Sequence, residues 1–224
     1  MSRRISILLL GIMLMAFGAI NGGWSLLLLW PGANFLILGI AHFKNAPGIF
    51  GKRPDGTLPF WRWLIFLPLL LYTNLLWRIA CFLSREPAQN TVSADLVVGR
   101  RLFPSEVDGK FVNYIDLTAE FSEPTAIRGL SAYQCFPILD GGIPRIEELN
   151  NALDRLRPGR TFIHCAQGHG RTGLFAVAML LKRGVVQTVD EGLEKLCASR
   201  PGIQLNKVQR QCIEKFAVSL KSPP

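Results

Sequence analysis

Paired cysteines are absent from the sequence. Its five cysteines include no Cys-x-x-Cys pair and no other spacing typical of metal ligands, and the chain has three histidines. This pattern excludes a zinc finger or a dithiol redox centre as the explanation of the cysteines. Acidic residues are also scarce, with 16 against 25 basic residues and a formal net charge of +9.

The basic excess is concentrated in the N-terminal part. Residues 1–89 contain eight basic and two acidic residues, a net charge of +6, whereas residues 90–224 contain seventeen and fourteen, a net charge of +3. The N-terminal basic residues flank long apolar runs and form no stripe on the polar part of the chain, which is not typical of a nucleic-acid-binding surface. We therefore expect the charge to lie beside a membrane, and we expect no nucleic-acid partner.

Charge is missing altogether from two stretches near the N-terminus. Residues 5–20 are uncharged, and after Asn21-Gly22-Gly23 a second run, 24–41, is interrupted only by Pro31 and Asn34. A membrane-spanning helix needs about 20 apolar residues and can be as short as about 17, so the two runs predict a helical hairpin. A cleaved signal peptide is the alternative, but the second run follows the first directly and no convincing cleavage site separates them.

A third apolar run, residues 63–77, is broken by Pro68 and flanked by Arg62 and Arg78. It could span the membrane or lie at its surface as a helix. If only the first two runs span, all eight basic residues of 1–89 face the cytoplasm, as the positive-inside rule prefers. We therefore predict that residues 1–83 are membrane-anchoring helices of a multi-pass membrane protein whose C-terminal domain is cytoplasmic.

The polar segment 84–93 contains Pro87 and predicts a linker. Beyond it, segments 95–99, 111–117, 132–138 and 161–164 predict strands, because they are rich in Val, Ile, Tyr and Phe. Four helical patterns are present. The first follows Pro144 and the second covers 174–181; the third begins at a capping box from Thr188 to Glu191, and the fourth follows Asn206. Strands that alternate with helices predict that residues 94–220 form an α/β domain, a three-layer sandwich with a mainly parallel central sheet.

Residues 161–173, TFIHCAQGHGRTG, have the pattern of a catalytic phosphate-binding loop. A strand would end at Cys165, and a helix would begin near Arg171. Inward-turned backbone N–H groups between them could bind a phosphate at the positive end of the helix, and Gly168 and Gly170 permit such a turn. The residues that would contribute these N–H groups are Ala166, Gln167, Gly168, His169, Gly170 and Arg171.

The side chains of this loop suit nucleophilic catalysis on phosphate. A cysteine at a helix N-terminus near a cation favours the thiolate, so Cys165 is the predicted nucleophile. Arg171 offers a planar guanidinium that matches two phosphate oxygens. The hydroxyl of Thr172 could donate to the cysteine sulfur as it departs, and His164 is expected to order the loop.

The motif His164-Cys165, five residues, Arg171-Thr172 resembles the signature of the cysteine-dependent dual-specificity branch of the protein tyrosine phosphatases. The resemblance implies hydrolysis of phosphotyrosine, phosphoserine or phosphothreonine on proteins through a phosphocysteine intermediate, with no metal or other cofactor. A phospholipid headgroup, such as a phosphoinositide or phosphatidylglycerophosphate, is the alternative substrate. Gln167 and His169 stand where lipid-directed members often have lysines, so the loop itself does not indicate a lipid.

A general acid is expected upstream. The run CFPILDGGIP, residues 135–144, resembles the mobile acid loop of the same family, with Asp140 25 residues before Cys165. Gly141 and Gly142 would let the loop close over the site, although Asp140 could instead merely cap a helix. Arg200-Pro201 and Gln209 are similar to a C-terminal region of the family that supports the catalytic loop, and Gln209 is a candidate for positioning water.

Three alternatives remain open from the sequence. The domain could bind phosphorylated partners without catalysis, although a binding module would not need the trio of Cys165, Arg171 and Asp140. Sulfur transferases of the rhodanese type also place a cysteine in an anion-binding loop; low-molecular-weight phosphatases do so too, but as a family they have the loop near the N-terminus and the acid far downstream, unlike this chain. Cys135 could form a disulfide with Cys165 under oxidation.

Overall fold

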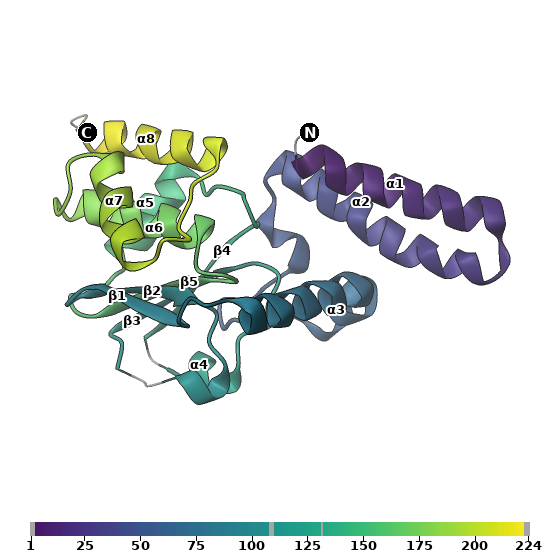
Figure 1. Ribbon diagram of the computed structural model, residues 1–224, viewed down its shortest axis with the longest axis horizontal. Helices are drawn as coiled ribbons and strands as arrows, with labels where there is room; N and C mark the ends of the chain where they lie inside the picture. Colours follow the sequence, from purple (N-terminus) through teal and green to yellow (C-terminus); the bar gives the residue numbers. More distant parts are fainter. Residues whose placement is uncertain (1–2, 108–109, 131, 222–224) are drawn as a thin grey trace.

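The computed structural model describes residues 3–107, 110–130 and 132–221. A five-stranded sheet lies at the centre of the C-terminal part, with helices α5 to α8 on one face and the short α4 on the other (Figure 1). Helices α1, α2 and α3 extend to one side of this sheet.

The helical hairpin expected at the N-terminus is present. α1 (Arg3–Asn21) is followed by the 3₁₀ helix η1 (Gly23–Leu28) and by α2 (Leu29–Lys44). The two α-helices approach each other closely, since a Cβ placed on Gly11 would lie 2.8 Å from the backbone nitrogen of Leu36. Glycine therefore permits close packing of two backbones, which is a common means of association between helices in apolar surroundings.

The third apolar run lies within one longer helix, α3 (Phe60–Leu83), which bends at Phe66. At the bend, the Ile65 carbonyl accepts hydrogen bonds from Trp30 Nε1 at 2.7 Å and from Asn34 Nδ2 at 3.0 Å. An irregular backbone in apolar surroundings needs such replacement partners. Trp30 and Asn34 of the second run thus hold α2 against α3.

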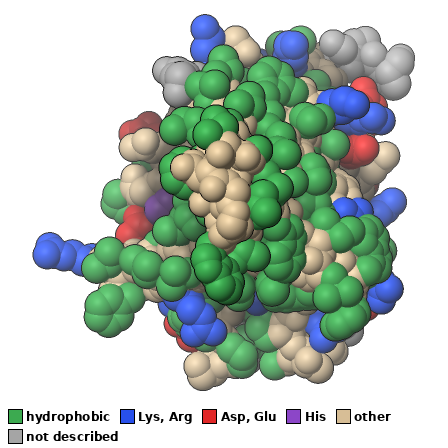
Figure 2. Space-filling model, turned by 90° about the vertical axis from the view of Figure 1, so that its right-hand side faces the viewer, with side chains coloured by type: hydrophobic (Ala, Val, Ile, Leu, Met, Phe, Trp, Pro, Cys, Tyr) green, Lys and Arg blue, Asp and Glu red, His purple; other side chains and the backbone are tan. Residues whose placement is uncertain are grey.

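Among the residues that the structure describes, three helical segments are long and apolar enough to cross a bilayer. They are Arg4–Asn21, Gly23–Lys44 and Phe60–Leu83. Figure 2 shows that hydrophobic side chains cover much of the molecular face seen from the side of these helices. Exposed residues of the three segments include Met13, Leu75 and Phe82, whose exposed fractions are 67%, 58% and 88%.

The sheet has the strand order β1-β2-β5-β3-β4, in which β1 is antiparallel to β2 and the other pairs are parallel. The prediction of a mainly parallel sheet is therefore confirmed. The prediction of a linker over 84–93 is wrong for its second half, which is β1. Its polar composition suits an edge strand, because one long side of such a strand pairs with no neighbour. The strands are β1 (Gln89–Ser93), β2 (Leu96–Arg100), β3 (Asn113–Thr118), β4 (Tyr133–Ile138) and β5 (Thr161–Cys165).

The helices of the domain follow the predicted order. α6 is the expected central helix, because every residue from 171 to 181 is buried. Thr188 Oγ1 accepts a hydrogen bond from the Glu191 N–H, and Asn206 Oδ1 accepts one from the Gln209 N–H, so both predicted caps are present. The helices are α4 (Thr125–Arg128), α5 (Ile146–Asp154), α6 (Gly170–Lys182), α7 (Val189–Ser199) and α8 (Lys207–Lys221), with short 3₁₀ turns at Pro47–Phe50 and Pro104–Glu106.

The segment between α2 and α3 inserts into the C-terminal domain. Lys52 Nζ donates hydrogen bonds to Asp116 Oδ2 at 2.5 Å and to the Thr118 carbonyl at 2.7 Å. The Lys52 and Asp116 side chains are 1% and 0% exposed. Nearby, Phe66 and Leu69 of α3 pack in one apolar cluster with Leu139 of the domain. The N-terminal helices therefore share a buried interface with the domain that they were expected only to anchor.

Replacing Lys52 with Met should destabilise the protein by about 3–5 kcal/mol, because the buried Asp116 carboxylate would lose its charged partner. Burial alone would raise the pKa of Asp116, but Lys52 and His164 outweigh it and hold that pKa well below its ordinary value of 3.8. The stabilisation from this pair is therefore present above pH 3.8 and is lost as the pH falls. Denaturant unfolding should give the Lys52→Met protein a lower free energy of unfolding than the wild type at pH 7, and this difference should narrow towards pH 3.

Arg53→Met is the matched control, since Arg53 is exposed beside Lys52. It should unfold like the wild type. Equal stability of the Lys52→Met and Arg53→Met proteins at pH 7 would contradict the assigned role of the buried pair.

Candidate active site

Cys165 lies at the end of β5, where the chain turns into α6. The backbone N–H of Gly168 points at the cysteine sulfur, with a nitrogen to Sγ distance of 3.3 Å. Gly168 has φ +76°, and a Cβ there would lie 2.4 Å from the backbone of Gly99 on the neighbouring strand. The loop therefore requires glycine at 168 for both backbone conformation and space. Gly170 does not share the positive φ expected of it; it begins α6, where a Cβ would lie 3.0 Å from Gln209 Oε1.

Arg171 brings its guanidinium to the same place from the first turn of α6. Its Nη1 and Nη2 atoms donate to the two carboxylate oxygens of Glu120 at 2.9 and 2.8 Å, and Nη1 also donates to the Ile138 carbonyl at 3.0 Å. Nη2 lies 3.4 Å from Asp140 Oδ1. Burial disfavours the charge on Arg171, but Glu120, Asp140 and Cys165 outweigh that effect and raise its pKa. The arginine is therefore a permanent buried cation.

Asp140 reaches the site from the loop after β4, and its side chain is 50% exposed. The two residues after it are held from the C-terminal side, because Asn206 Nδ2 donates to the Gly141 carbonyl at 2.9 Å and Gln209 Nε2 donates to the Gly142 carbonyl at 3.2 Å. Gln209 is buried, so the structure places it as a support of the acid loop. Sequence order alone could not indicate that contact.

The acid loop is also tied to the N-terminal hairpin. Asn45, the residue that ends α2, donates from Nδ2 to the Ile143 carbonyl at 2.7 Å and accepts from the Ile143 N–H at 3.4 Å. Asn45 has φ +48°, a left-handed conformation that asparagine tolerates better than most residues. The loop expected to be mobile is thus held from both sides in this structure.

Thr172 and His164 are both buried near Cys165. Among the described residues, the Thr172 hydroxyl has no hydrogen-bond partner, so the expected bond to the cysteine sulfur is not formed here. His164 stacks on Phe162 with 5.5 Å between ring centroids and meets the edge of Tyr114 at 5.1 Å. Burial lowers the pKa of His164 to about 4. It is therefore neutral at neutral pH, which suits the ordering role expected of it.

Arg200 supports the back of the cysteine loop. Its guanidinium donates to the carbonyls of Gly168 at 3.0 Å and Gln167 at 2.8 Å, and it lies 3.3 Å from the Glu86 carboxylate. Glu86 also contacts His169 Nε2 at 2.7 Å. The place of Arg200 agrees with the likeness noted around Arg200-Pro201. Glu86 and Glu120 were missed, because both lie in segments with no local motif.

A disulfide between Cys135 and Cys165 does not fit the strand order. Cys135 on β4 pairs with Asp116 on β3, and Asp116 pairs with His164 on β5. Two strand spacings separate Cys135 from β5, roughly 10 Å, whereas disulfide-bonded residues have Cα atoms within about 7 Å. Burial also raises the pKa of Cys135 to about 11. The disulfide that the sequence left open is therefore incompatible with this strand order.

One buried cluster has the residue types of a metal site. Ligand atoms of Asp116, Glu123 and His164 lie within 4.8 Å of one another. However, Lys52 already donates to Asp116, and Arg101 Nε lies 2.7 Å from Glu123 Oε1. The two basic side chains thus supply positive charge where a metal ion would. We assign this cluster to the interface between Lys52 and the domain.

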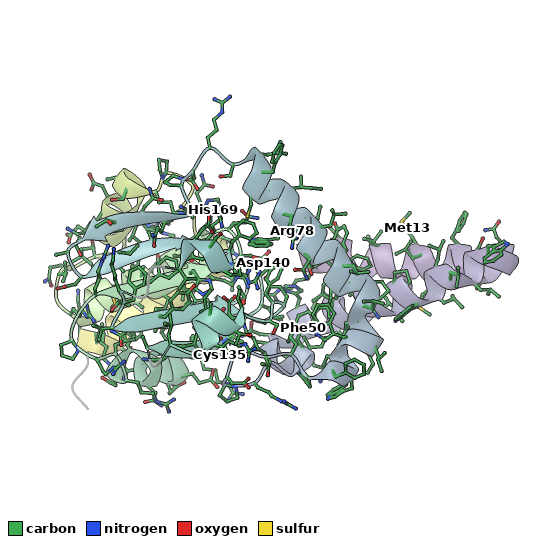
Figure 3. All side chains as sticks on the ribbon, turned by 90° about the horizontal axis from the view of Figure 1, so that it is seen from below. Met13, Phe50, Arg78, Cys135, Asp140 and His169 are labelled. Atoms are coloured by element: carbon green, nitrogen blue, oxygen red, sulfur yellow. The ribbon has the colours of Figure 1, made fainter. Side chains whose placement is uncertain are left out.

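The cysteine loop opens into a cavity of about 840 Å³. Cys165, Arg171 and Asp140 line it together with residues of α1, α2 and α3 and with Phe50 and Phe121. Trp77 of α3 donates from Nε1 to the Ala166 carbonyl at 3.0 Å, which joins α3 directly to the loop. In Figure 3, Asp140 and His169 lie on the side of the domain that faces α3.

No protein-family model and no curated protein sequence matches the chain. Solved structures do match it. Tk-PTP in its active form is 23% identical, with 59% of this chain and 97% of that chain covered and a TM-score of 0.52. PTPMT1 in complex with PI(5)P is 12% identical, with 60% and 97% covered and a TM-score of 0.53. A mouse putative dual specificity phosphatase complexed with zinc tungstate is 16% identical, with 62% and 92% covered and a TM-score of 0.53.

At these identities the likeness concerns the fold. The mainly parallel sheet, the cysteine at the end of its central strand and the buried helix that follows are common to the predicted and the observed architecture, whereas the antiparallel edge strand β1 was not predicted. The C-terminal part of the chain therefore has the fold of the tyrosine and dual-specificity phosphatases.

Proposed function

We propose that the chain is a cysteine-dependent phosphomonoesterase whose catalytic domain spans residues 94–220. The observation that carries this proposal is that Cys165, Arg171 and Asp140 all line one cavity, with the Arg171 guanidinium 3.4 Å from the Asp140 carboxylate. These three groups are what two-step phosphate transfer through cysteine requires: a nucleophile, a clamp for the phosphoryl oxygens, and an acid.

In the first step the Cys165 thiolate attacks phosphorus. A sulfur–phosphorus bond forms while the bond from phosphorus to the ester oxygen breaks, and Asp140 gives its proton to the departing oxygen. In the second step Asp140 takes a proton from water as the water attacks phosphorus. The sulfur–phosphorus bond then breaks, which releases inorganic phosphate and restores the thiolate.

Glu120 determines which edge of Arg171 is available for phosphate. Its two oxygens occupy the end of the guanidinium formed by Nη1 and Nη2. The side edge, Nε with Nη2, remains for two phosphoryl oxygens, and the buried Nε has no hydrogen-bond partner among the described residues. Asp140 lies 3.4 Å from Nη2. A phosphate bound at this edge would displace the Asp140 carboxylate, which would then lie near the ester oxygen of the leaving group. Glu120 is thus a positioning residue for Arg171.

Phosphorylated proteins and phospholipid headgroups would be hydrolysed by the same steps. The resemblance of the loop to dual-specificity phosphatases makes proteins that carry phosphotyrosine, phosphoserine or phosphothreonine the first candidate substrates and lipid headgroups the second. A module that binds phosphate without turnover is the third possibility, and it is the one that mutation of the nucleophile separates from the other two.

The full chain, purified in detergent with a metal chelator, should hydrolyse p-nitrophenyl phosphate. Cys165→Ser should lower the turnover rate at least a thousandfold but should still bind tungstate, because the loop amides and Arg171 remain. Arg171→Lys should lose about a hundredfold or more, since lysine cannot make two parallel hydrogen bonds. Cys197→Ser, outside the cavity, is the control. Tungstate binding without turnover by the wild type would favour the binding module, and turnover retained in Cys165→Ser would contradict the proposal.

We also propose that α1 and α2 span the membrane while α3 lies along its surface. Just before α3, the Gly56 carbonyl accepts a hydrogen bond from the Glu123 N–H at 3.0 Å. Within α3, Leu69 packs with Leu139 of the domain, and Trp77 donates a hydrogen bond to the Ala166 carbonyl. Both halves of α3 therefore contact the domain. A helix crossing a hydrocarbon core of about 30 Å could not keep both contacts. The basic residues then share one side with the catalytic domain, which is the cytoplasm by the positive-inside rule.

Reporter fusions test this arrangement. A reporter that is active only outside the cytoplasm should be inactive after Pro224 and active when inserted at Gly22, the turn between the two spans. Activity after Pro224 would overturn the proposed topology, whatever the chemistry of the site.

A further inference from the structure

The cavity that holds the cysteine loop is built largely by the N-terminal helices. Beyond the loop its walls are mostly apolar. They include Ile7 and Leu10 of α1, Leu38 of α2, and Leu76, Ile79 and Leu83 of α3, beside the polar Ser6, His42 and Thr73. A volume of about 840 Å³ far exceeds what a phosphate group needs. A pocket for a phosphorylated side chain alone would not require three apolar helices around it.

We propose that the substrate is a membrane lipid carrying a phosphate monoester, with its phosphate at Cys165 and its hydrocarbon part between α1 and α3. This inference rests on the proposed phosphatase chemistry and names its substrate class. A lipid satisfies both ends of the cavity, because its phosphate suits the buried cation and its hydrocarbon suits the apolar walls.

The site lies at the depth where a lipid headgroup would be found. Ser6 near the start of α1 and His42 near the end of α2 line the cavity together with Cys165. If α1 and α2 span the bilayer, these residues mark the cytoplasmic ends of both spans. The phosphate loop then lies level with the headgroups, and the substrate need not leave the membrane.

The arrangement of the helices gives the hydrocarbon part a way out. α2 packs against both α1 and α3, whereas the cavity lies between α1 and α3. Its lining residues Leu10, Leu76 and Leu83 are 40%, 46% and 70% exposed, so these walls continue into the outer apolar surface of the helices. Acyl chains could extend from the cavity into the bilayer between these two helices.

A phosphorylated polypeptide fits these walls poorly. Its backbone N–H and C=O groups would enter with the phosphorylated side chain, and each would need a hydrogen-bond partner once removed from water. Most of the lining side chains of α1 and α3 are apolar and offer none, and only Ser6, Tyr72, Thr73 and Trp77 among them carry a polar group. The charge of the N-terminal part, +6 over residues 1–89, also favours an anionic lipid surface.

The test compares substrates on the full chain in detergent micelles and in phosphatidylcholine vesicles. The probes are phosphatidic acid, phosphatidylglycerophosphate and phosphatidylinositol monophosphate, each with short and long acyl chains, beside a phosphotyrosine peptide and p-nitrophenyl phosphate. At least one long-chain lipid should exceed the peptide in kcat/KM by a hundredfold or more. The same headgroup on short chains should be at least tenfold poorer, because its hydrocarbon would not reach the apolar walls.

Two tryptophan substitutions on α3 provide a matched pair. Leu76 lines the cavity and Leu75 beside it is exposed outside it. Leu76→Trp should lower the ratio of lipid to p-nitrophenyl phosphate hydrolysis at least tenfold, by filling the space for the hydrocarbon. Leu75→Trp should leave that ratio unchanged and shows whether a new tryptophan on α3 disturbs the fold.

The outcomes separate this inference from the function on which it rests. If p-nitrophenyl phosphate is hydrolysed through Cys165 but the peptide is preferred, or acyl length has no effect, or Leu76→Trp leaves the ratio unchanged, the lipid substrate is wrong and the phosphatase stands. If no substrate in the panel is hydrolysed by the wild type, the phosphatase proposal itself fails.

Discussion

The site depends on a buried cation that is held but not neutralised on every side. Arg171 is 2% exposed, and Glu120 fixes one end of its guanidinium in a two-bond contact. A buried charge without a partner would be strongly unfavourable, and a fully enclosed pair would leave nothing to bind a ligand. This conflict is resolved because Glu120 leaves the buried Nε atom without a hydrogen-bond partner among the described residues, and we propose that this edge binds phosphate oxygens. Nucleophile and substrate are thus attracted by the same group.

The N-terminal helices are built into this site and do more than attach it to a membrane. Lys52 is buried against Asp116, Asn45 bonds the acid loop, and Trp77 bonds the cysteine loop. These contacts come from three different segments of the first 83 residues, so the position of the acid and the shape of the cavity both depend on them. A catalytic domain cut at residue 84 or later would lose all three.

Much of the site could be predicted from local sequence, because the nucleophile, the loop glycines and the arginine lie within seven residues of one another. Contacts between distant segments could not. Glu120 pairs with Arg171 across 51 positions and Lys52 with Asp116 across 64, and neither acidic residue lies in a motif. The polar sequence of β1 predicts a linker because edge strands need few apolar residues. The sequence also leaves a Cys135–Cys165 disulfide open, because spacing along the chain does not reveal that β3 lies between β4 and β5.

Direct detection of the covalent intermediate tests the central claim. Asp140→Asn removes the base of the second step, and p-nitrophenyl phosphate, whose leaving group needs little protonation, still permits the first. Rapid acid quenching of this variant followed by peptide mass spectrometry should find one phosphoryl group on Cys165, and none in the Cys165→Ser protein. Product release with phosphate on His169, or with no phosphorylated residue at any time during turnover, would contradict the proposed role of Cys165.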